Sequence, residues 1–365
     1  MCNVKQLTFS VLLLLSCLAL FSVQAKPPKR ILLVDSYHKE YLWSQETHRG
    51  FASALLEAGL INDPNEVEQI RVGKSISNST VIIKSLWMDS KRKSSARELA
   101  LATNQVMAVV KKFNPEIVLL GDDNATNYIG NQLIDTKTPV IFWGVNGNPN
   151  KYHFMDSNDK PGHNITGVYQ KGYYRQSLLR LKQLVPLAKT FAIISDDTPT
   201  GRSKAKIIQA IARQGNSPLE LKKTIITSSF KIWKEKIKMI ANEVDAFFML
   251  NHQGLKKPDG KSVEMYTAGK WYLKNIHLPE CSDEKQFVQE GMLLTVDDSG
   301  FNQGYAAGDM LLNILSGAKI PAKMPAIAPP PGPLIVNRQR LKQLKIKIPT
   351  GFSADQHIDK SLALQ

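Results

Sequence analysis

The stretch "EIVLLGDDNAT", residues 116–126, contains the pattern on which the fold assignment rests. Four consecutive apolar residues, 117–120, are followed at once by acidic and amide side chains. A continuous apolar run is typical of a strand that is buried on both faces of a sheet. The polar residues lead into a predicted helix from about Ala125. A strand that runs directly into a helix is the repeating unit of parallel sheets.

The same unit repeats before and after this stretch. The predicted strands of the first series are residues 30–36, 66–72, 116–123 and 139–145, and its longer predicted helices are 44–59 and 95–113. A loop rich in Asn, Asp, Gly and Pro, residues 146–164, separates a second series. Its predicted strands are 190–197, 221–227 and 246–252, and its predicted helices are 173–185, 202–214, 230–242 and 262–275. We therefore predict an α/β protein with two doubly wound parallel-sheet lobes.

Length and charge agree with this division. A chain of 365 residues is long enough for two domains that each bury a core. The formal net charge is +15, but the lysines and arginines are scattered along the chain. Scattered charge is typical of a solvated basic surface, so we expect no nucleic-acid partner.

The N-terminal segment has the pattern of a secretory signal. Residues 1–5 carry one lysine, residues 7–23 are almost entirely apolar, and "SVQAKPPKR" follows. This predicts a signal peptide over residues 1–25, with cleavage after Ala25 and a periplasmic protein as the product. A retained membrane anchor is the alternative, because about 17 apolar residues is the short limit for a span. After cleavage only Cys281 remains, which excludes an intrachain disulfide and a cysteine-based metal site.

Polar residues follow the predicted strands in both lobes. In an open parallel sheet, ligands collect at the carboxyl ends of the strands, where loops converge and helices begin with free amides. The polar strand ends are "DSYH" (35–38), "GDDNAT" (121–126), "WGVNGN" (143–148), "SDDTPTGRS" (195–203) and "LNHQ" (250–253). This repetition predicts a cleft lined by both lobes.

Large aromatic residues crowd the first of these strand ends. Tyr37 and Trp43 are candidates for an aromatic wall that stacks on an apolar or planar part of a ligand, with His38 as a donor. The alternative is that Trp43 packs against the following helix while Tyr41 is exposed. Ser36 ends the first strand beside them.

Two kinds of charged ligand group fit the remaining strand ends. A carboxylate would meet free amides at the helix start near Asp123 and at residues 200–203, since a helix N-terminus favours anions. An ammonium group would be received by Asp122, Asp123 or Asp298. Helix capping alone is the alternative explanation for Asp123 and Asn124. The combination fits an amino acid or a similar zwitterion.

Several longer segments resemble one known family in the same order along the chain. They are "NPEIVLLGDDNAT" (114–126), "TPVIFWGVNGNP" (138–149), "GHNITGVY" (162–169), residues 178–203, residues 277–326 and "PLIVNRQRLKQLKIKIPTGF" (333–352). The chain resembles the substrate-binding proteins of ABC transporters with the type I periplasmic binding fold, the group that includes tryptophan-type binding proteins. The resemblance covers most of residues 30–352.

The resemblance implies two lobes joined by a three-strand hinge, with a small-molecule ligand trapped between them. The implied division is 26–169 plus 293–322 for the N-terminal lobe and 170–292 plus 323–365 for the C-terminal lobe. It also implies an ABC permease as partner, a monomer, and no cofactor or metal. With the aromatic wall, the expected ligand-binding residues are Ser36, Tyr37, His38, Trp43, Asp123, Asn124, Ala125, Gly144, Asn146, Thr200, Gly201, Ser203, Asn251 and Asp298.

One segment departs from the transporter pattern. "SYHKEYLW", residues 36–43, is bulkier than the small residues of many transporter-linked members and is more similar to extracellular sensing relatives that partner membrane kinases. The predicted function is capture of an amino-acid-like or amphipathic solute for an ABC transporter; the alternative is a ligand sensor for a membrane receptor kinase. The sequence has no GxSxG, no HExxH and no complete P-loop, so we do not expect an enzyme.

Overall fold

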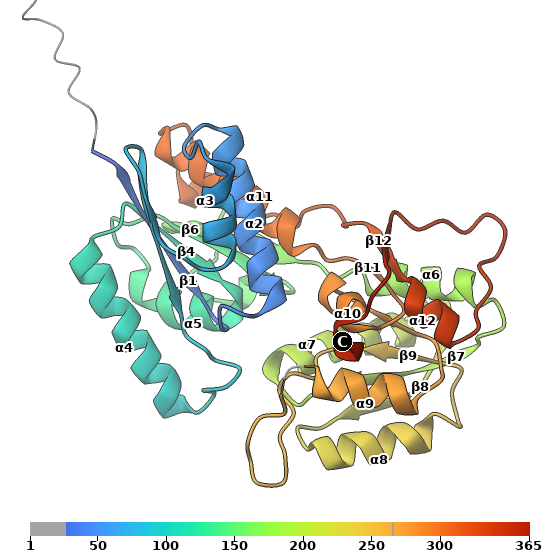
Figure 1. Ribbon diagram of the computed structural model, residues 1–365. Coiled ribbons are helices and arrows are strands. Elements are labelled where there is room, and N and C mark those ends of the chain that lie inside the picture. Colours follow the sequence, from blue (N-terminus) through green and yellow to red (C-terminus); the bar gives the residue numbers. More distant parts are fainter. Residues whose placement is uncertain (1–26, 265) are drawn as a thin grey trace, which may run out of the picture.

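The computed structural model describes residues 27–264 and 266–365, and the predicted signal peptide lies outside these ranges. The chain forms two lobes, each built on its own sheet with helices on both faces (Figure 1). Across the described ranges, none of the helices combines the length and the apolar character that a membrane span requires. The predicted two-lobed α/β fold is confirmed.

The sheet of the first lobe is parallel except at one edge. Its order is β2-β3-β1-β4-β5-β6, and only β2 runs antiparallel to its neighbour. The strands are β1 (Lys29–Asp35), β2 (Ile76–Ser77), β3 (Val81–Trp87), β4 (Ile117–Gly121), β5 (Val140–Asn146) and β6 (Ile165–Gln170). The helices are α2 (Leu42–Glu57), α3 (Pro64–Arg71), α4 (Ala96–Phe113), α5 (Asp122–Leu133) and α11 (Gly300–Leu315), with the short 3-10 helices η1 (Pro149–Lys151) and η2 (Pro321–Lys323).

The apolar strands of this sheet are buried on both faces. Ile31 and Leu33 of β1 pack in one core with α2 and α11, whereas Leu32 and Val34 pack in another with α4 and α5. Successive side chains of a strand point to opposite faces, so a strand covered on both sides must be continuously apolar.

The second lobe has a sheet of order β13-β12-β11-β10-β9-β7-β8, in which β11 and β12 are antiparallel. Its strands are β7 (Thr190–Ser195), β8 (Glu220–Ile226), β9 (Ala246–Met249), β10 (Glu280–Ser282), β11 (Leu294–Val296), β12 (Leu334–Asn337) and β13 (Gln356–Ile358). Its helices are α6 (Tyr174–Leu184), α7 (Pro199–Arg213), α8 (Phe230–Ile240), α9 (Thr267–Asn275), α10 (Lys285–Glu290), α12 (Arg338–Gln343) and η3 (Leu362–Leu364).

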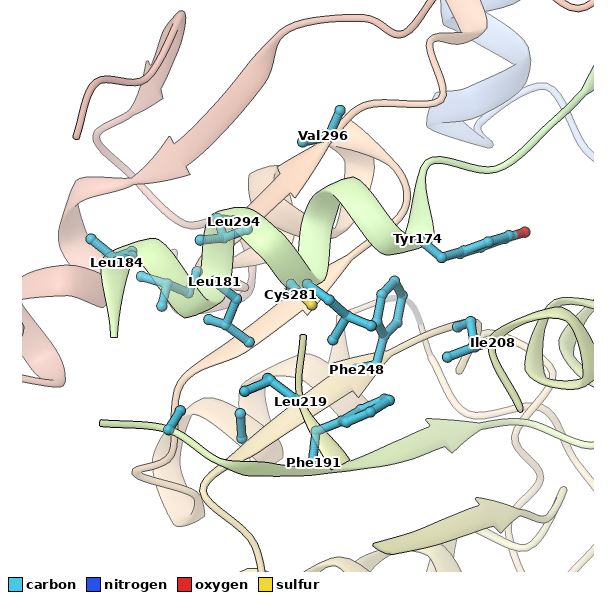
Figure 2. Close-up of a cluster of buried hydrophobic side chains, with 14 of the residues drawn as sticks. Tyr174, Leu181, Leu184, Phe191, Ile208, Leu219, Phe248, Cys281, Leu294 and Val296 are labelled. Carbon is cyan, nitrogen blue, oxygen red and sulfur yellow. The ribbon is translucent and has the colours of Figure 1, made fainter. Parts of the chain in front are cut away.

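Apolar side chains fill the space between this second sheet and helices α6 and α7. Figure 2 shows Leu181 of α6 and Ile208 of α7 with Phe191 and Phe248 of the sheet. Cys281 is a free thiol in the same core and is fully buried. Burial raises the pKa of Cys281 well above its usual value, which keeps the thiol protonated and unreactive.

One predicted strand is wrong. Residues 66–72 lie in helix α3 and its C-cap, and the next strands are β2 and β3. Helix α3 has a strong start signal, because Pro64 occupies its first turn and the Asp63 side chain accepts a hydrogen bond from the amide of Asn65. These local signals favour a helix over the strand that was predicted there.

The chain crosses between the lobes three times, and two crossings differ from the predicted boundaries. Residues 293–322 were assigned to the first lobe, but β11 (294–296) pairs with β10 and β12 in the second sheet. The chain therefore crosses after Val296. It returns after Ile327, whose backbone is hydrogen-bonded to Gly167 and Tyr169 of β6. An apolar strand next to a hinge does not indicate in its own sequence which sheet it joins.

Helix α11 crosses helix α2 with their backbones in direct contact (Figure 1). A Cβ atom on Gly304 would lie 1.8 Å from the carbonyl oxygen of Thr47, and one on Gly50 would lie 2.0 Å from the carbonyl oxygen of Phe301. No side chain fits at either position. The contact brings the start of α11 against Trp43, since a Cβ on Gly300 would lie 3.2 Å from Trp43 Cε3.

We predict that Gly304→Ala lowers the free energy of unfolding by about 1–3 kcal/mol, because the added methyl group forces the two helices apart. The loss occurs although alanine is the better helix former by about 1 kcal/mol. Urea unfolding followed by circular dichroism measures it. Asp309→Ala, on the exposed side of the same helix, is the control and should change stability by no more than about 0.5 kcal/mol. Equal stabilities of the two variants would contradict the close backbone contact.

Candidate ligand-binding cleft

A cleft of about 630 Å³ lies between the lobes. Its walls include Tyr37, Asp123 and Asn146 from the first lobe and Thr200 and Ser203 from the second. A smaller cavity of about 10 Å³ continues inward from it, since Tyr37, Asn146 and Thr200 line both spaces. We call the larger space the outer cleft and the smaller one the inner cavity.

Three aromatic side chains line the inner cavity from the first lobe. Tyr37, Tyr41 and Trp43 are buried and form a cluster of their own, in which the rings of Tyr37 and Tyr41 meet edge to face with centroids 4.8 Å apart. Within the described part of the chain, Trp43 Nε1 has no hydrogen-bond partner. Tyr37 and Trp43 therefore lie together at the cavity, with an indole donor at its edge, and their stacking on a ligand stays a prediction.

Tyr41 also joins the two lobes. The Gln286 side chain, in helix α10 of the second lobe, donates a hydrogen bond of 3.0 Å from Nε2 to the hydroxyl oxygen of Tyr41. Nearby, Lys285 Nζ lies 3.6 Å from Glu46 Oε2 of helix α2. Tyr41 is thus buried against the second lobe, in contrast to the exposed position considered from the sequence.

The second lobe contributes a buried lysine with two acidic partners. Lys204 of α7 is 2% exposed, and its Nζ lies 2.7 Å from Asp283 Oδ2 and also contacts Glu284 Oε1. Burial alone would lower the pKa of Lys204, but Asp283 and Glu284 raise it well above the usual value, so the side chain is charged. Lys204 and Glu284 both line the inner cavity.

The first lobe contributes a buried carboxyl group without a partner. Asp122 begins helix α5 in the left-handed region, with φ of 64°, and its Oδ2 has no hydrogen-bond partner among residues 27–264 and 266–365. Burial, followed by the nearby Asp35 and Asp123, raises its pKa well above the usual value. Gly144 leaves room for it, because a Cβ there would lie 2.9 Å from Asp122 Oδ1. This carboxyl group lines the inner cavity.

Amide side chains face the inner cavity from both lobes. Asn146 donates a hydrogen bond of 2.5 Å from Nδ2 to Asp123 Oδ2, and its Oδ1 is buried. Asn251, on the second lobe, has a buried Oδ1 as well. In the described ranges neither oxygen has a hydrogen-bond partner. Both are free to accept a hydrogen bond from a bound molecule.

The sequence model of one family, described as ABC transporter substrate binding protein, matches residues 82–357. This chain belongs to that family. The match covers most of both lobes and confirms the resemblance noted from the sequence. A comparison with curated proteins finds no match to this substrate-binding protein.

Several solved structures share its fold. An ABC domain in complex with L-Trp from Streptococcus pneumonia matches with a TM-score of 0.68 and 20% identity, over 91% of this chain and 100% of that one. A ligand-free, open substrate-binding protein with adhesive properties from Clostridium difficile matches with a TM-score of 0.65 and 18% identity, over 91% and 100%. A conserved domain protein from Vibrio cholerae has a TM-score of 0.67 and 14% identity, over 90% and 99%.

Most of the expected ligand-binding residues of this substrate-binding protein lie in the cleft. The inner cavity is lined by Tyr37, Trp43, Asn146, Thr200 and Asn251, and the outer cleft adds Asp123, Asn124 and Ser203. Residues from five separate strand ends thus come together, as the strand-end pattern predicts. Ligand contact by each of them stays a prediction.

The other expected residues build the loops around the cleft and do not line it. Ser36 Oγ donates to the carbonyl oxygen of Gly121 at 2.6 Å and accepts from the amide of Ala125 at 2.8 Å. The Gly144 amide donates to Gln303 Oε1 at 3.1 Å. A Cβ on Gly201 would lie 2.4 Å from Ser195 Oγ. These contacts fix the strand-to-helix turns from which the cavity residues project.

His38 and Asp298 lie at the edges of the site. His38 lines a separate pocket of about 70 Å³, and burial lowers its pKa to about 4, so it is neutral at pH 7. Asp298 lies at a lobe crossing, where its Oδ2 accepts a hydrogen bond of 3.0 Å from the amide of Gly172 at another crossing. Burial raises the pKa of Asp298 to about 8. His38 thus lies at a pocket lined by both lobes, and Asp298 lies at the hinge.

Sequence reasoning missed several cavity residues, namely Tyr41, Gln170, Lys204 and Glu284. A signal for Lys204 exists, because the buried positions of α7 are 201, 204, 205 and 208, at helical spacing. A lysine on the buried face of a helix requires a partner. A signal for Glu284 also exists, since it follows the end of β10 as the other polar clusters follow their strands.

We predict that Lys204→Met lowers the free energy of unfolding at pH 7 by about 3–5 kcal/mol, because Asp283 and Glu284 lose their counter-charge inside the protein. Lys206→Met is the matched control, since Lys206 lies in the same helix but is exposed, and its loss should cost less than about 0.5 kcal/mol. Urea unfolding of both variants provides the comparison. Similar small losses in the two variants would contradict the buried ion pair.

Proposed function

We propose that this substrate-binding protein captures a small amino-acid-like or amphipathic molecule between its lobes and delivers it to an ABC permease. The lining of the two adjoining spaces carries this proposal. The outer cleft of about 630 Å³ has room for such a molecule, whereas the inner cavity of about 10 Å³ is smaller than the molecule and supplies the groups at its inner end. The aromatic wall comes from the first lobe, while charged and amide groups come from both lobes. Such a lining suits a molecule with an apolar body and a charged head.

Different polar groups of the cleft can bind the two charges of a zwitterion. The carboxyl group of Asp122 reaches the cavity with an Oδ2 that has no hydrogen-bond partner in the described chain, and an ammonium group bound there would offset the burial that raises its pKa. The N-terminus of α7, with Thr200 in its first turn, suits a carboxylate, whereas the ammonium of Lys204 is already paired with Asp283 and Glu284. A ligand with only one of these charges leaves part of the lining without a partner, which costs free energy.

The proposed mechanism is a shift between open and closed lobes. A ligand that contacts Tyr37 on one lobe and Thr200 on the other makes both sets of contacts only when the lobes are closed, and so favours that state. Gln286 and Lys285 add direct contacts between the lobes. Export to the periplasm, the monomeric state, the absence of catalysis and the alternative of a kinase-linked sensor stay predictions.

L-tryptophan is the first compound to test. The similar Streptococcus pneumonia domain is described in complex with L-Trp, and the aromatic wall here suits an indole ring. Identity of 20% shows a shared fold and leaves the ligand of this chain to experiment.

We predict that at least one compound from a panel of amino acids, nucleosides, sugars and small organic acids raises the thermal unfolding midpoint. A ligand at 100 times its dissociation constant adds about 2.7 kcal/mol to stability. Tyr37→Ala should weaken that binding at least about tenfold, because it removes a ring from the cavity wall. Tyr305→Ala, on helix α11 with its hydroxyl bonded to Glu57, is the control and should bind normally.

An unchanged midpoint with every compound would contradict the proposed capture of a small solute. Binding that survives Tyr37→Ala and Asn146→Ala unchanged would contradict the assignment of the cleft.

A further inference from the structure

Lys91 holds an ammonium group over the aromatic wall. It lies in the turn between β3 and α4, and its Nζ is 4.2 Å from the ring centroid of Tyr37 and 4.7 Å from that of Tyr41. A cation above an aromatic face is attracted by the negative charge of that face. The two tyrosines of the inner cavity therefore already face a cation, and it belongs to the protein itself.

Lys91 differs from the other cations that line the outer cleft, of which Lys151 and Arg202 are paired with acids and Lys256 donates a hydrogen bond of 2.9 Å to Ser262 Oγ. Lys151 Nζ lies 2.5 Å from Asp123 Oδ1, and an Arg202 guanidinium nitrogen lies 2.6 Å from Asp197 Oδ1. Within residues 27–264 and 266–365, no carboxylate oxygen comes within 4.0 Å of Lys91 Nζ. The ammonium group of Lys91 thus lies against tyrosine rings, whereas the cationic groups of Lys151 and Arg202 are paired with carboxylates.

The acids around Lys91 include Asp122, which is assigned above to an ammonium group of the ligand. Burial lowers the pKa of Lys91, whereas Asp196, Glu284 and Asp122 oppose that effect. Asp122 and Glu284 line the inner cavity from opposite lobes. The side chain thus lies near the acids of both lobes without a direct ion pair to either.

We propose that the ammonium group of Lys91 occupies the position that a cationic group of the ligand takes, so that an amine binds only by displacing Lys91. This inference rests on the proposed function. It predicts that the site distinguishes aromatic amines from aromatic acids, because only the amines compete with Lys91. Lys91 also lines the pocket of about 70 Å³ beside His38 and Glu264, which offers the displaced side chain a second position.

If amines displace Lys91, its removal should change the affinity for aromatic amines and the affinity for aromatic acids differently. An aromatic amine competes with the Lys91 ammonium for the rings of Tyr37 and Tyr41, so removal of that ammonium strengthens its binding. An aromatic acid leaves Lys91 in place and gains a cationic neighbour, so the same removal weakens its binding or leaves it unchanged.

The test compares tryptamine with indole-3-propionate, which share an indole ring and carry opposite charges. Dissociation constants are measured by calorimetry for the unmodified protein, Lys91→Met and Lys93→Met. Lys93 is an exposed lysine of the same segment and serves as the matched control. We expect tryptamine to bind Lys91→Met at least fivefold more tightly than the unmodified protein, with no gain for indole-3-propionate and no change in Lys93→Met. Lys91→Gln, a second neutral variant, should reproduce the gain.

Two results would overturn the proposal. If tryptamine binds Lys91→Met and Lys91→Gln no more tightly than the unmodified protein, Lys91 does not compete with the amine. The proposed function is then still supported, provided that at least one panel compound raises the unfolding midpoint. If neither indole compound binds any of the proteins and no panel compound raises the unfolding midpoint, the proposed function fails together with this inference.

Discussion

Helices α2 and α11 touch backbone to backbone at Gly50 and Gly304, where no side chain fits between them. Helix α11 begins directly after the chain leaves the second sheet at Val296, so this contact attaches the end of one lobe crossing to the first helix of the other lobe. The same helix α2 carries Trp43 at its start. The position of the aromatic wall therefore depends on the contact that anchors the hinge.

The helix contact fixes the first-lobe wall of the cleft, while several charged side chains in the cleft are only partly paired. Lys204 has two acidic partners in its own lobe, whereas Asp122 on the opposite lobe has an oxygen without a partner in the described chain, and Lys91 has only aromatic rings. Buried polar groups that lack partners cost free energy until something satisfies them. A ligand that bridges the lobes supplies those partners, which is how binding energy can favour closure.

Much of the fold and part of the site could be predicted from the sequence. Continuous apolar runs mark strands buried on both faces, and Tyr37, Trp43 and Thr200 follow from the polar strand ends. The strand predicted at 66–72 failed because local capping by Asp63 favoured a helix. Lys204 lies at the helical spacing of the buried positions of α7, but its acidic partner Glu284 is 80 residues away, and the sequence does not indicate such a long-range pair. For the same reason the sequence did not indicate that β11 joins the second sheet.

The central claim is that a ligand is held between the two lobes and closes them. Pulsed electron paramagnetic resonance measures the distance between two spin labels. The labels are placed on Leu101→Cys in α4 and Met239→Cys in α8, two exposed positions on opposite lobes. With the panel compound that raises the unfolding midpoint most, we predict a shorter and narrower distance distribution than without it. A compound that binds and leaves the distribution unchanged would contradict capture between the lobes.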